Sequence, residues 1–325
     1  MDKQDALPFI VADIGGTSAR FGLATAIDQR TGGVTVDQRH TFHSGEYDSF
    51  EAVLASYMEE LGELQPNAAC VAIAGPVIGD RIRVTNLGWQ FSIDSVRKAF
   101  GLQRLELIND FGLQAYATLY LDKSDMSCLQ AGTAQANAPR AVIGPGTGLG
   151  VAGLVKSGDH WMPVCGEGGH ITYAPTSDRE LEVRHIIEPA NNHVSLEKFV
   201  SGPGLVNVHR ALSQLNGEQY QSLTPAEISR RAMHGADRVC VEALELFCKI
   251  LGSAAGDVAL ILGAWGGVYL GGGILPKIES VLSDSLFLES FRNKGRMGEY
   301  LQQVPIYLMK GDEPALHSAA HWLYD

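Results

Sequence analysis

Short apolar runs recur along the chain, and several of them end at glycine-rich turns or at polar residues. Residues 9–12 and 21–24 are apolar and flank a Gly-Gly-Thr turn, which predicts two buried strands joined as a β-hairpin. Residues 140–143 and 151–155 flank a second glycine-rich turn in the same way. A P-loop has strand, turn and helix instead, and no G-x-x-x-x-G-K-[ST] motif occurs. The pattern therefore predicts two similar hairpins and argues against a Walker-type NTPase.

Helical and extended patterns alternate over the rest of the chain, which predicts an α/β protein. Thr224 and Pro225, with Glu227 three residues after the threonine, predict a capped helix start for a long helical tract that ends near residue 251. The other predicted elements are strands at residues 70–74 and 105–108 and helices at residues 50–62, 111–120 and 314–324.

One apolar stretch raises the question of a membrane span. Residues 258–275 contain no charged side chain over 18 positions, which is long enough to cross a bilayer. Six of these residues are glycine, and Asp257 directly precedes them. The stretch therefore indicates a buried helix that continues into a buried strand, rather than a transmembrane helix.

The first glycine-rich turn has the chemistry of a phosphate-binding loop. The glycines in Asp13-Ile14-Gly15-Gly16-Thr17 allow the backbone to approach a ligand and to direct N–H groups at phosphate oxygens. Thr17 adds a hydroxyl donor, and Asp13 supplies a carboxylate beside the phosphates, where a Mg²⁺ ion would be held. An ordinary hairpin turn with an exposed aspartate is the alternative.

The second turn, at residues 144–150, strengthens this interpretation because the same arrangement is repeated. Four glycines surround Thr147, more than a hairpin turn requires. The repetition also suggests two similar halves of the molecule. No fixed-period sequence repeat accompanies it, so any duplication would be structural only.

Three further polar or glycine-rich segments are candidates for ligand binding. Asn109 and Asp110 follow a predicted strand, where ligands of α/β sheets bind, although Asp110 could also be a plain helix N-cap. Gly166-Glu167-Gly168-Gly169-His170 crowds a carboxylate and an imidazole together, and a metal site is its weaker interpretation. The triple glycine at 271–273 permits the approach of a flat ring such as adenine, with a bare flexible turn as the alternative.

Composition narrows the class of protein further. The chain has 325 residues, which suggests two domains, and its net charge of −12 argues against nucleic acid as a partner. Five cysteines stand at unpatterned spacings without a C-x-x-C motif, as expected of reduced thiols in a cytoplasmic protein. We expect no membrane partner.

Taken in order, these motifs resemble those of the bacterial glucokinases, over residues 11 to about 323. The resemblance rests on the segments just described together with Ile108-Asn109-Asp110-Phe111, Ser201-Gly202-Pro203-Gly204-Leu205-Val206-Asn207 and Gly271-Gly272-Gly273-Ile274. It implies the two-domain, actin-like ATPase (ribonuclease H-like) fold, with a ligand cleft between the domains. Ser18 and His317 depart from the residues usual in the family, and the cysteine-rich zinc signature of the related repressor/ORF/kinase group is absent.

The resemblance also implies the roles of individual residues. The glucose pocket would be lined by Asn109, Asp110, Glu167, His170 and Glu197, with Asp110 as the catalytic base. For Glu197, a first-turn acid that stabilises its helix is the alternative from position alone. ATP would be held by Ala12, Asp13, Ile14, Gly15, Gly16, Thr17, Gly144, Gly146, Thr147, Gly148, Gly271, Gly272 and Gly273.

These expectations describe a glycolytic transferase that phosphorylates glucose at the 6-hydroxyl. ATP is the phosphoryl donor, and Mg²⁺ is held by Asp13 directly or through water. A kinase of another hexose (mannose, fructose or an N-acetylated sugar) is the first alternative, and a non-catalytic sugar-sensing regulator or a cytoskeletal or chaperone ATPase is a weaker one. The family suggests a homodimer. The predicted domains are a small α/β domain of residues 1–120 plus 311–325 and a large α/β domain of residues 121–310.

Overall fold

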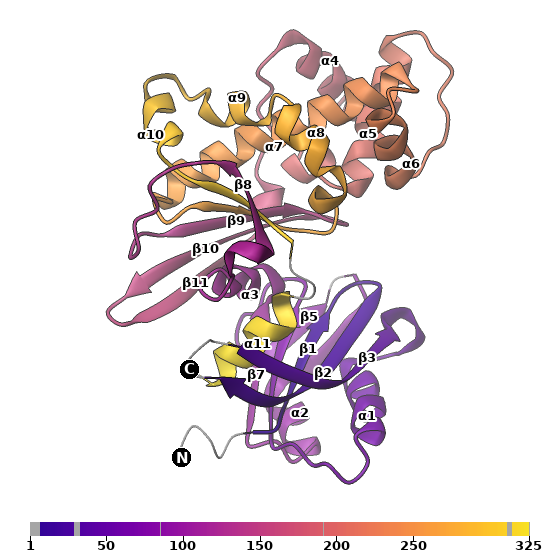
Figure 1. The fold of residues 1–325 in the computed structure, drawn as a ribbon. Coiled ribbons are helices and arrows are strands. Elements are labelled where there is room, and N and C mark those ends of the chain that lie inside the picture. The colour runs from indigo at the N-terminus through magenta and orange to yellow at the C-terminus, as the bar shows by residue number, and fades with distance from the viewer. Residues whose placement is uncertain (1–6, 29–32, 85, 191, 311–313, 325) are drawn as a thin grey trace. The chain divides into compact units, whose positions relative to one another are not determined.

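Two main β-sheets organise the fold, and the chain divides into two compact units (Figure 1). The first unit comprises residues 1–122, 161–165 and 311–325, and the second comprises residues 123–160 and 166–310. The computed structural model describes residues 7–28, 33–84, 86–190, 192–310 and 314–324. Part of the predicted small domain, residues 1–6, 29–32, 85, 311–313 and 325, therefore lies outside the described residues.

The first sheet has the strand order β3-β2-β1-β4-β7. Its strands are β1 (Phe9–Ile14), β2 (Ser18–Asp28), β3 (Gly33–His43), β4 (Ala68–Ile73) and β7 (Arg104–Asn109). The predicted hairpin of β1 and β2 is confirmed, because the two strands pair antiparallel from Phe9 opposite Ala24 to Ile14 opposite Ala19. β4 and β7 run parallel to β1, so the carboxyl ends of these three strands meet at one edge.

Alternate residues of β1 belong to two different hydrophobic cores. Ile10, Ala12 and Ile14 pack in the core that includes residues of α1 (Phe50–Glu60) and α2 (Ile93–Ala99). Phe9 and Val11 pack in the core that includes residues of α3 (Asp110–Ala117) and α11 (Pro314–Tyr324). Burial of both faces explains why β1 is a continuous apolar run rather than an alternating one. A separate hairpin, β5 (Arg81–Val84) with β6 (Trp89–Ser92), completes the strands of this region.

The second sheet repeats this plan, with the order β11-β10-β9-β12-β13-β8. Its strands are β8 (Met126–Gln130), β9 (Arg140–Pro145), β10 (Leu149–Ser157), β11 (His160–Gly166), β12 (Val268–Leu270) and β13 (Ile306–Met309). β9 and β10 form the second predicted hairpin, and β12 and β13 run parallel to β9 as β4 and β7 do to β1. The two sheets thus share a core of one hairpin and two further parallel strands, which is the structural duplication that the two loops suggested.

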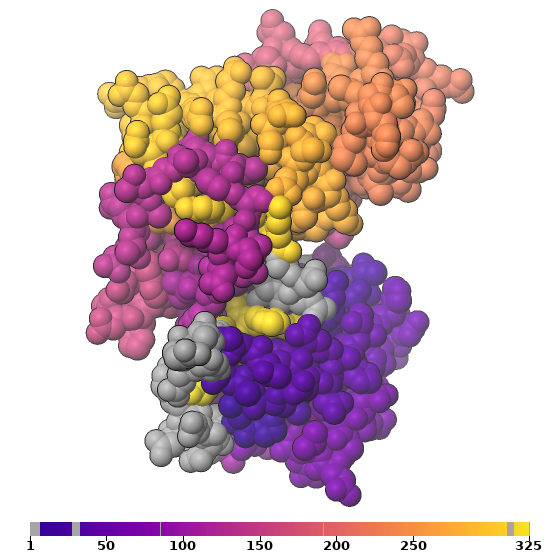
Figure 2. Space-filling view, viewed as in Figure 1, coloured from indigo at the N-terminus to yellow at the C-terminus, as the bar shows by residue number. Residues whose placement is uncertain are grey.

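Helices and short 3-10 turns supply the rest of the second unit. The helices are α4 (Asp178–Ile187), α5 (Gly202–Leu215), α6 (Pro225–Met233), α7 (Arg238–Leu262), α8 (Glu279–Asp284), α9 (Phe287–Arg292) and α10 (Gly298–Gln302). α9 and α10, in yellow-orange, lie on the visible surface of this unit (Figure 2). Within the described residues, no helix combines the length and apolar character needed to span a membrane.

The single helical tract predicted from Thr224 to about residue 251 is wrong in two respects. It is broken into α6 and α7, because Gly235 adopts a left-handed φ of 62° and Asp237 starts a new helix as its N-cap. The second helix continues past residue 251 to Leu262, where Gly263 ends it with a φ of 61°. The stretch from 258 is therefore helix followed by the buried strand β12, as expected.

Two glycines on α7 allow α9 to pack against its backbone. A Cβ atom at Gly252 would overlap the carbonyl oxygen of Phe287, and one at Gly256 would lie 2.5 Å from the carbonyl oxygen of Phe291. Glycine normally weakens a helix by about 1 kcal/mol relative to alanine. Its presence at two positions one turn apart is therefore explained by the close approach of α9.

We predict that Gly252→Ala destabilises the protein despite the better helix propensity of alanine. A backbone oxygen cannot rotate away as a side chain can, so the overlap should cost about 1–3 kcal/mol of unfolding free energy. Urea denaturation followed by circular dichroism measures the change. Glu245→Ala, an exposed substitution on the same helix, is the control and should change stability little. Equal stability of the Gly252→Ala and parent proteins would contradict this account of the packing.

Candidate active site

The first glycine-rich loop is held by hydrogen bonds from its own backbone and from Ser44. The Gly15 N–H donates to the carbonyl oxygen of Ser18 at 2.9 Å, and the Ser44 hydroxyl donates to the carbonyl oxygen of Gly15 at 2.9 Å. The Ser44 N–H also donates to the carbonyl oxygen of Thr17 at 3.0 Å. Ser44 is fully buried, and no local pattern in the sequence marks it as a partner of this loop.

Asp13 lies near the end of β1, opposite Arg20 on β2. The nearest oxygen of its carboxylate is 3.3 Å from an Arg20 guanidinium nitrogen, and the arginine side chain is 44% exposed. A pair this exposed contributes little to stability. Asp13 therefore presents a carboxylate at the loop beside a cationic neighbour.

Asn109 and Asp110 stand where β7 ends and α3 begins. Ile14, Ile73 and Asn109 are matched in register across β1, β4 and β7, so Asn109 ends its strand at the same edge as the first loop. Its side-chain oxygen accepts from the Gly112 N–H at 3.0 Å, and its amide donates to the carbonyl oxygen of Gly75 at 3.1 Å. Asn109 is thus anchored at both ends of its amide group.

The alternative interpretation of Asp110 as the helix N-cap is wrong, because Asn109 caps α3. Asp110 is the first residue of the helix, and one of its carboxylate oxygens accepts from the Phe111 N–H at 2.9 Å. The position of Asp110 is therefore fixed by a helix cap that Asn109 provides, and Asp110 itself does not cap the helix.

Cys165 is a neighbour of Asp110 that sequence reasoning missed. A Cβ atom at Gly112 would overlap the Cys165 sulfur, so the glycine makes room for the thiol at the start of α3. Partial burial raises the pKa of the thiol, and the Asp110 carboxylate raises it further against a hydrogen bond from the Asn109 backbone. No cysteine motif in the sequence could have indicated this position.

The second glycine-rich loop is tied to the start of α5. The Gly146 N–H donates to the carbonyl oxygen of Gly148, and the Gly202 N–H donates to that of Gly146, both at 2.8 Å. Thr147 at the tip of the loop is exposed. A Cβ atom at Gly146 would meet nothing within 4 Å, so this glycine borders open space.

Glu197 braces the same loop from a different element. It lies in the three-residue 3-10 turn η5 (Leu196–Lys198), and its carboxylate accepts from the Leu149 N–H at 2.9 Å. Glu197 does lie in the first turn of η5, as the alternative interpretation expected, but its carboxylate also bonds a different segment of the chain. A Cβ atom at Gly148 would overlap a carboxylate oxygen of Glu197, so the glycine is required for this contact.

The segment that carries Glu167 and His170 packs directly on β10. It forms the 3-10 turn η4 (Gly168–His170), and Glu167 makes a β-bridge with Val151. A Cβ atom at Gly169 would overlap the carbonyl oxygen of Leu149, which shows how closely the turn approaches the loop. Glu167 and His170 are both exposed on this turn, so their side chains are accessible to a ligand.

The triple glycine at 271–273 has a role that the sequence did not reveal. A Cβ atom at Gly144 would lie 2.5 Å from the carbonyl carbon of Gly271, and one at Gly272 would overlap the carbonyl oxygen of Pro145. The two glycine segments therefore pack backbone against backbone. A Cβ atom at Gly273, in contrast, would meet nothing within 4 Å, so this glycine borders open space.

A buried charge cluster anchors the chain that follows His170. Glu180 is 2% exposed and accepts hydrogen bonds from the Tyr173 hydroxyl at 2.6 Å and from the Thr176 N–H and hydroxyl, each at 2.9 Å. The Lys249 ammonium lies 2.6 Å from its carboxylate. Burial alone would raise the pKa of Glu180, but the hydrogen bonds from these three residues outweigh it and lower the pKa below its usual value.

The structure therefore assembles the candidate residues in two sets. The first unit brings together the loop at 13–17 and the pair Asn109 and Asp110, on one edge of its sheet. The second unit brings together the loop at 144–150, the glycines at 271–273, Glu197 and the turn with Glu167 and His170.

Comparison with known proteins decides the family. A family model described as Glucokinase matches residues 10–325. A glucokinase of Saccharophagus degradans is 42% identical over 316 residues, which cover 97% of this chain and 98% of the relative.

The chain belongs to the glucokinase family. It catalyses the ATP-dependent phosphorylation of glucose. A non-catalytic regulator and a cytoskeletal or chaperone ATPase, considered from sequence, are therefore not supported.

Solved structures confirm the predicted fold class. A crystal structure of a glucokinase from an Antarctic psychrotroph has a TM-score of 0.86 at 42% identity and covers 98% of each chain. A ROK family glucokinase from Streptomyces griseus, in complex with glucose and AMPPNP, has a TM-score of 0.67 at 19% identity, with coverage of 97% and 98%. This glucokinase-family chain therefore has the α/β fold of the actin-like sugar kinases.

The two departures from the family pattern have different surroundings. Ser18 serves the first loop through its carbonyl oxygen, which any residue can supply. The ring nitrogen Nε2 of His317 on α11 lies 3.2 Å from a guanidinium nitrogen of Arg39 on β3, so it belongs to the packing of that helix on the sheet.

We predict that Glu180→Gln destabilises the protein at neutral pH by about 2–4 kcal/mol, because it leaves Lys249 without its buried partner. The folded pKa of Glu180 lies below the ordinary value of 4.5, so its stabilisation is present above that pH and is lost as pH falls through the folded pKa. The deficit of the variant should therefore shrink at acidic pH.

Chemical denaturation of both proteins between pH 7 and pH 3 measures this prediction. Glu182→Gln is the matched control, since Glu182 lies on the same helix with a side chain 56% exposed and should show little change. A deficit that is constant over the whole pH range would show that the charge of Glu180 is not the cause.

Proposed function

We propose that the protein transfers the γ-phosphoryl group of ATP to the 6-hydroxyl of glucose, with Asp110 as the general base. The observation that carries this proposal is the division of roles at the start of α3. Asn109 caps the helix, so the fold does not require a carboxylate at position 110. A carboxylate at that position is the group expected to accept the proton of an attacking hydroxyl.

The proposed sugar ligands are polar groups at fixed backbone positions. We assign glucose binding to Asn109, Asp110, Glu167, His170 and Glu197. Carboxylates accept from sugar hydroxyls, whereas the amide and the imidazole can donate or accept, so this set is complementary to a polyol. The exposure of Glu167 and His170 on a turn whose glycines are packed on β10 supports the assignment.

The proposed nucleotide ligands are mainly backbone N–H groups and glycine surfaces. We assign ATP to residues 12–17, to Gly144, Gly146, Thr147 and Gly148, and to residues 271–273. The open space at Gly146 and Gly273 supports this assignment, because a phosphate or a ring could approach the backbone there. The fixed donors would stabilise charge that develops on the transferred phosphoryl group.

Asp13 fits a role in holding Mg²⁺, directly or through water. Mg²⁺ prefers carboxylate and water oxygens, and Asp13 presents a partly exposed carboxylate beside the first loop. When bound, the ion would neutralise phosphate charge. Arg20, at 3.3 Å from the same carboxylate, competes for it, which favours contact through water.

We extend the proposal to the cellular context expected from sequence. The enzyme would act in the cytoplasm, in glycolysis and as a homodimer. Residues 1–120 with 311–325 and residues 121–310 would be its small and large domains. Light scattering on the purified protein tests the dimer.

We predict that Asp110→Asn lowers kcat for glucose by roughly 10²–10⁴-fold, because the amide cannot accept the proton. The KM for glucose should change much less, since the amide still hydrogen-bonds a hydroxyl. A coupled assay with a panel of hexoses measures both constants and the choice of sugar. Asp94→Asn, in the exposed first turn of α2, is the control and should retain parental kcat. Parental kcat in a folded Asp110→Asn protein would exclude Asp110 as the base.

We predict that Gly146→Val weakens ATP binding at least roughly 10-fold, equivalent to about 1.4 kcal/mol, while glucose binding persists. A Cβ atom at this position meets no protein atom within 4 Å, so the protein should fold normally and the side chain should fill the space assigned to a phosphate. Isothermal titration with each substrate measures the two affinities. Gly45→Val, at another glycine that borders open space, should leave both unchanged. Unaltered ATP affinity in Gly146→Val would remove this loop from the nucleotide site.

A further inference from the structure

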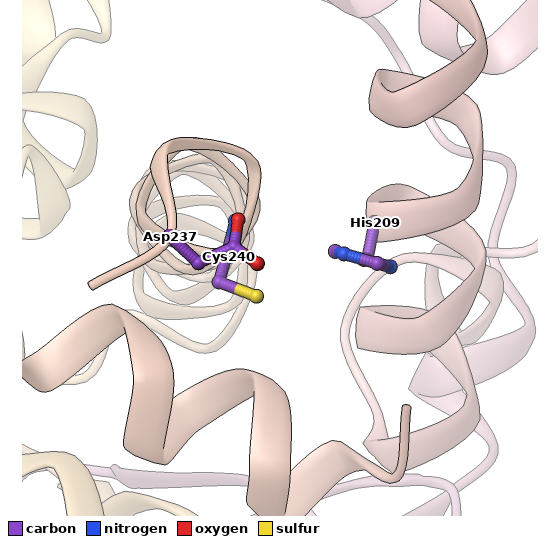
Figure 3. Close-up of side chains that lie close together, drawn as sticks. All are labelled: His209, Asp237 and Cys240. Carbon is purple, nitrogen blue, oxygen red and sulfur yellow. The ribbon is translucent and has the colours of Figure 1, made fainter. Parts of the chain in front are cut away.

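Three side chains with metal-binding chemistry meet between two helices of the second unit, apart from the residues assigned above. His209 lies on α5, and Asp237 and Cys240 lie at the start of α7 (Figure 3). One potential ligand atom from each residue falls within 4.8 Å of the other two. Among the described residues, these three are the potential metal ligands that lie close enough to share one ion. Neither Glu167 nor His170 belongs to this cluster.

His209 has an unmet hydrogen-bonding requirement inside the protein. Its side chain extends from α5 toward the other two residues (Figure 3), and the residue is only 3% exposed. Its Nδ1 atom is buried without a hydrogen-bond partner. A buried polar atom without a partner costs about 1–3 kcal/mol, so its retention needs an explanation. Burial lowers the pKa of His209, which favours the neutral ring whose lone pair can bind a metal.

Asp237 and Cys240 already interact with other groups of the protein, and a metal ion would compete with these groups for the two side chains. One carboxylate oxygen of Asp237 accepts from the N–H groups of Val239 and Cys240 at 3.0 and 3.1 Å, which caps α7. The other oxygen lies 3.5 Å from an Arg231 guanidinium nitrogen. The Cys240 thiol is buried beside the carboxylate, and burial followed by the charge of Asp237 raises its pKa to about 12.

We propose that His209, Asp237 and Cys240 form a binding site for a divalent transition-metal ion, with Zn²⁺ as the occupant. One imidazole, one carboxylate and one thiolate are ligands that Zn²⁺ takes in tetrahedral geometry, with water in the fourth position. Hard oxygen-seeking ions such as Mg²⁺ do not select a sulfur ligand. As the S–Zn bond forms, the S–H bond breaks and the proton passes to solvent.

The site would join α5 to α7 rather than take part in phosphoryl transfer. His209 lies seven residues after Gly202, the residue bonded to the loop at Gly146, which is about 10 Å along the helix. The ion would therefore stabilise α5, whose first turn is bonded to the loop at Gly146, but the ion itself would not contact that loop. We expect Zn²⁺ to raise thermal stability and to leave kcat largely unchanged.

Metal binding by three variants tests the proposal. The parent protein, stripped with a chelator, should bind one Zn²⁺ per chain at this site in equilibrium dialysis, and Co²⁺ should give a thiolate-to-cobalt charge-transfer band. Cys240→Ala should abolish the band and weaken binding at least roughly 100-fold. Cys248→Ala is the matched control, because Cys248 is a fully buried cysteine on the same helix that lies outside the cluster. It should bind like the parent.

Arg231→Gln provides a second test, because it should raise the affinity for Zn²⁺ whereas Cys240→Ala should lower it. It removes the cation that pairs with Asp237, so Zn²⁺ should bind several-fold more tightly, whereas a cluster with no metal function predicts no effect. Should Cys240→Ala fail to fold, Asp237→Asn gives the answer, because asparagine can still cap α7 but is a poorer metal ligand, so Zn²⁺ should bind at least several-fold more weakly than to the parent. Absence of Zn²⁺ binding by the parent, or a cobalt band that survives in Cys240→Ala, would overturn the proposal.

Discussion

Close contact of backbone with backbone at glycine is the constraint on which the candidate site of the second unit depends. Gly144 faces Gly271, Gly169 faces the carbonyl group of Leu149, and Gly148 leaves space for the Glu197 carboxylate. A methyl group at any of these positions would overlap its neighbour. The site is therefore built by four separate segments of chain that meet where side chains are missing, and its geometry is fixed mainly by main-chain atoms, together with the Glu197 carboxylate.

The local parts of this arrangement could be predicted from sequence, but their partners could not. Both hairpins followed from apolar runs around glycines, because strand burial and turn chemistry are properties of neighbouring residues. Ser44, Gly75 and Lys249 were missed as partners, because they contact a loop, an amide and a carboxylate, respectively, that lie far away in the sequence. The break between α6 and α7 was missed because Gly235 and Asp237 act through a left-handed turn and a cap within an otherwise helical pattern.

The structural duplication separates what the fold provides from what each loop requires. Both sheets place a glycine-rich turn between two antiparallel strands and set two further strands parallel to the first. The supports differ, because the first loop is held by a serine hydroxyl and the second by a glutamate and a helix start. The same strand arrangement therefore accommodates two loops with different chemistry. The two halves of the chain can share this arrangement without sharing a sequence repeat.

The bond between Gly202 and Gly146 directs the first turn of α5 at a loop that contains neither lysine nor arginine. The aligned peptide dipoles of a 14-residue helix are equivalent to roughly half a positive charge at that end. Such a charge belongs to the main chain, so it does not titrate and has no long side chain to order. An acidic protein, of net charge −12, thereby places a positive partial charge beside this loop that mutation of its ionisable residues cannot remove.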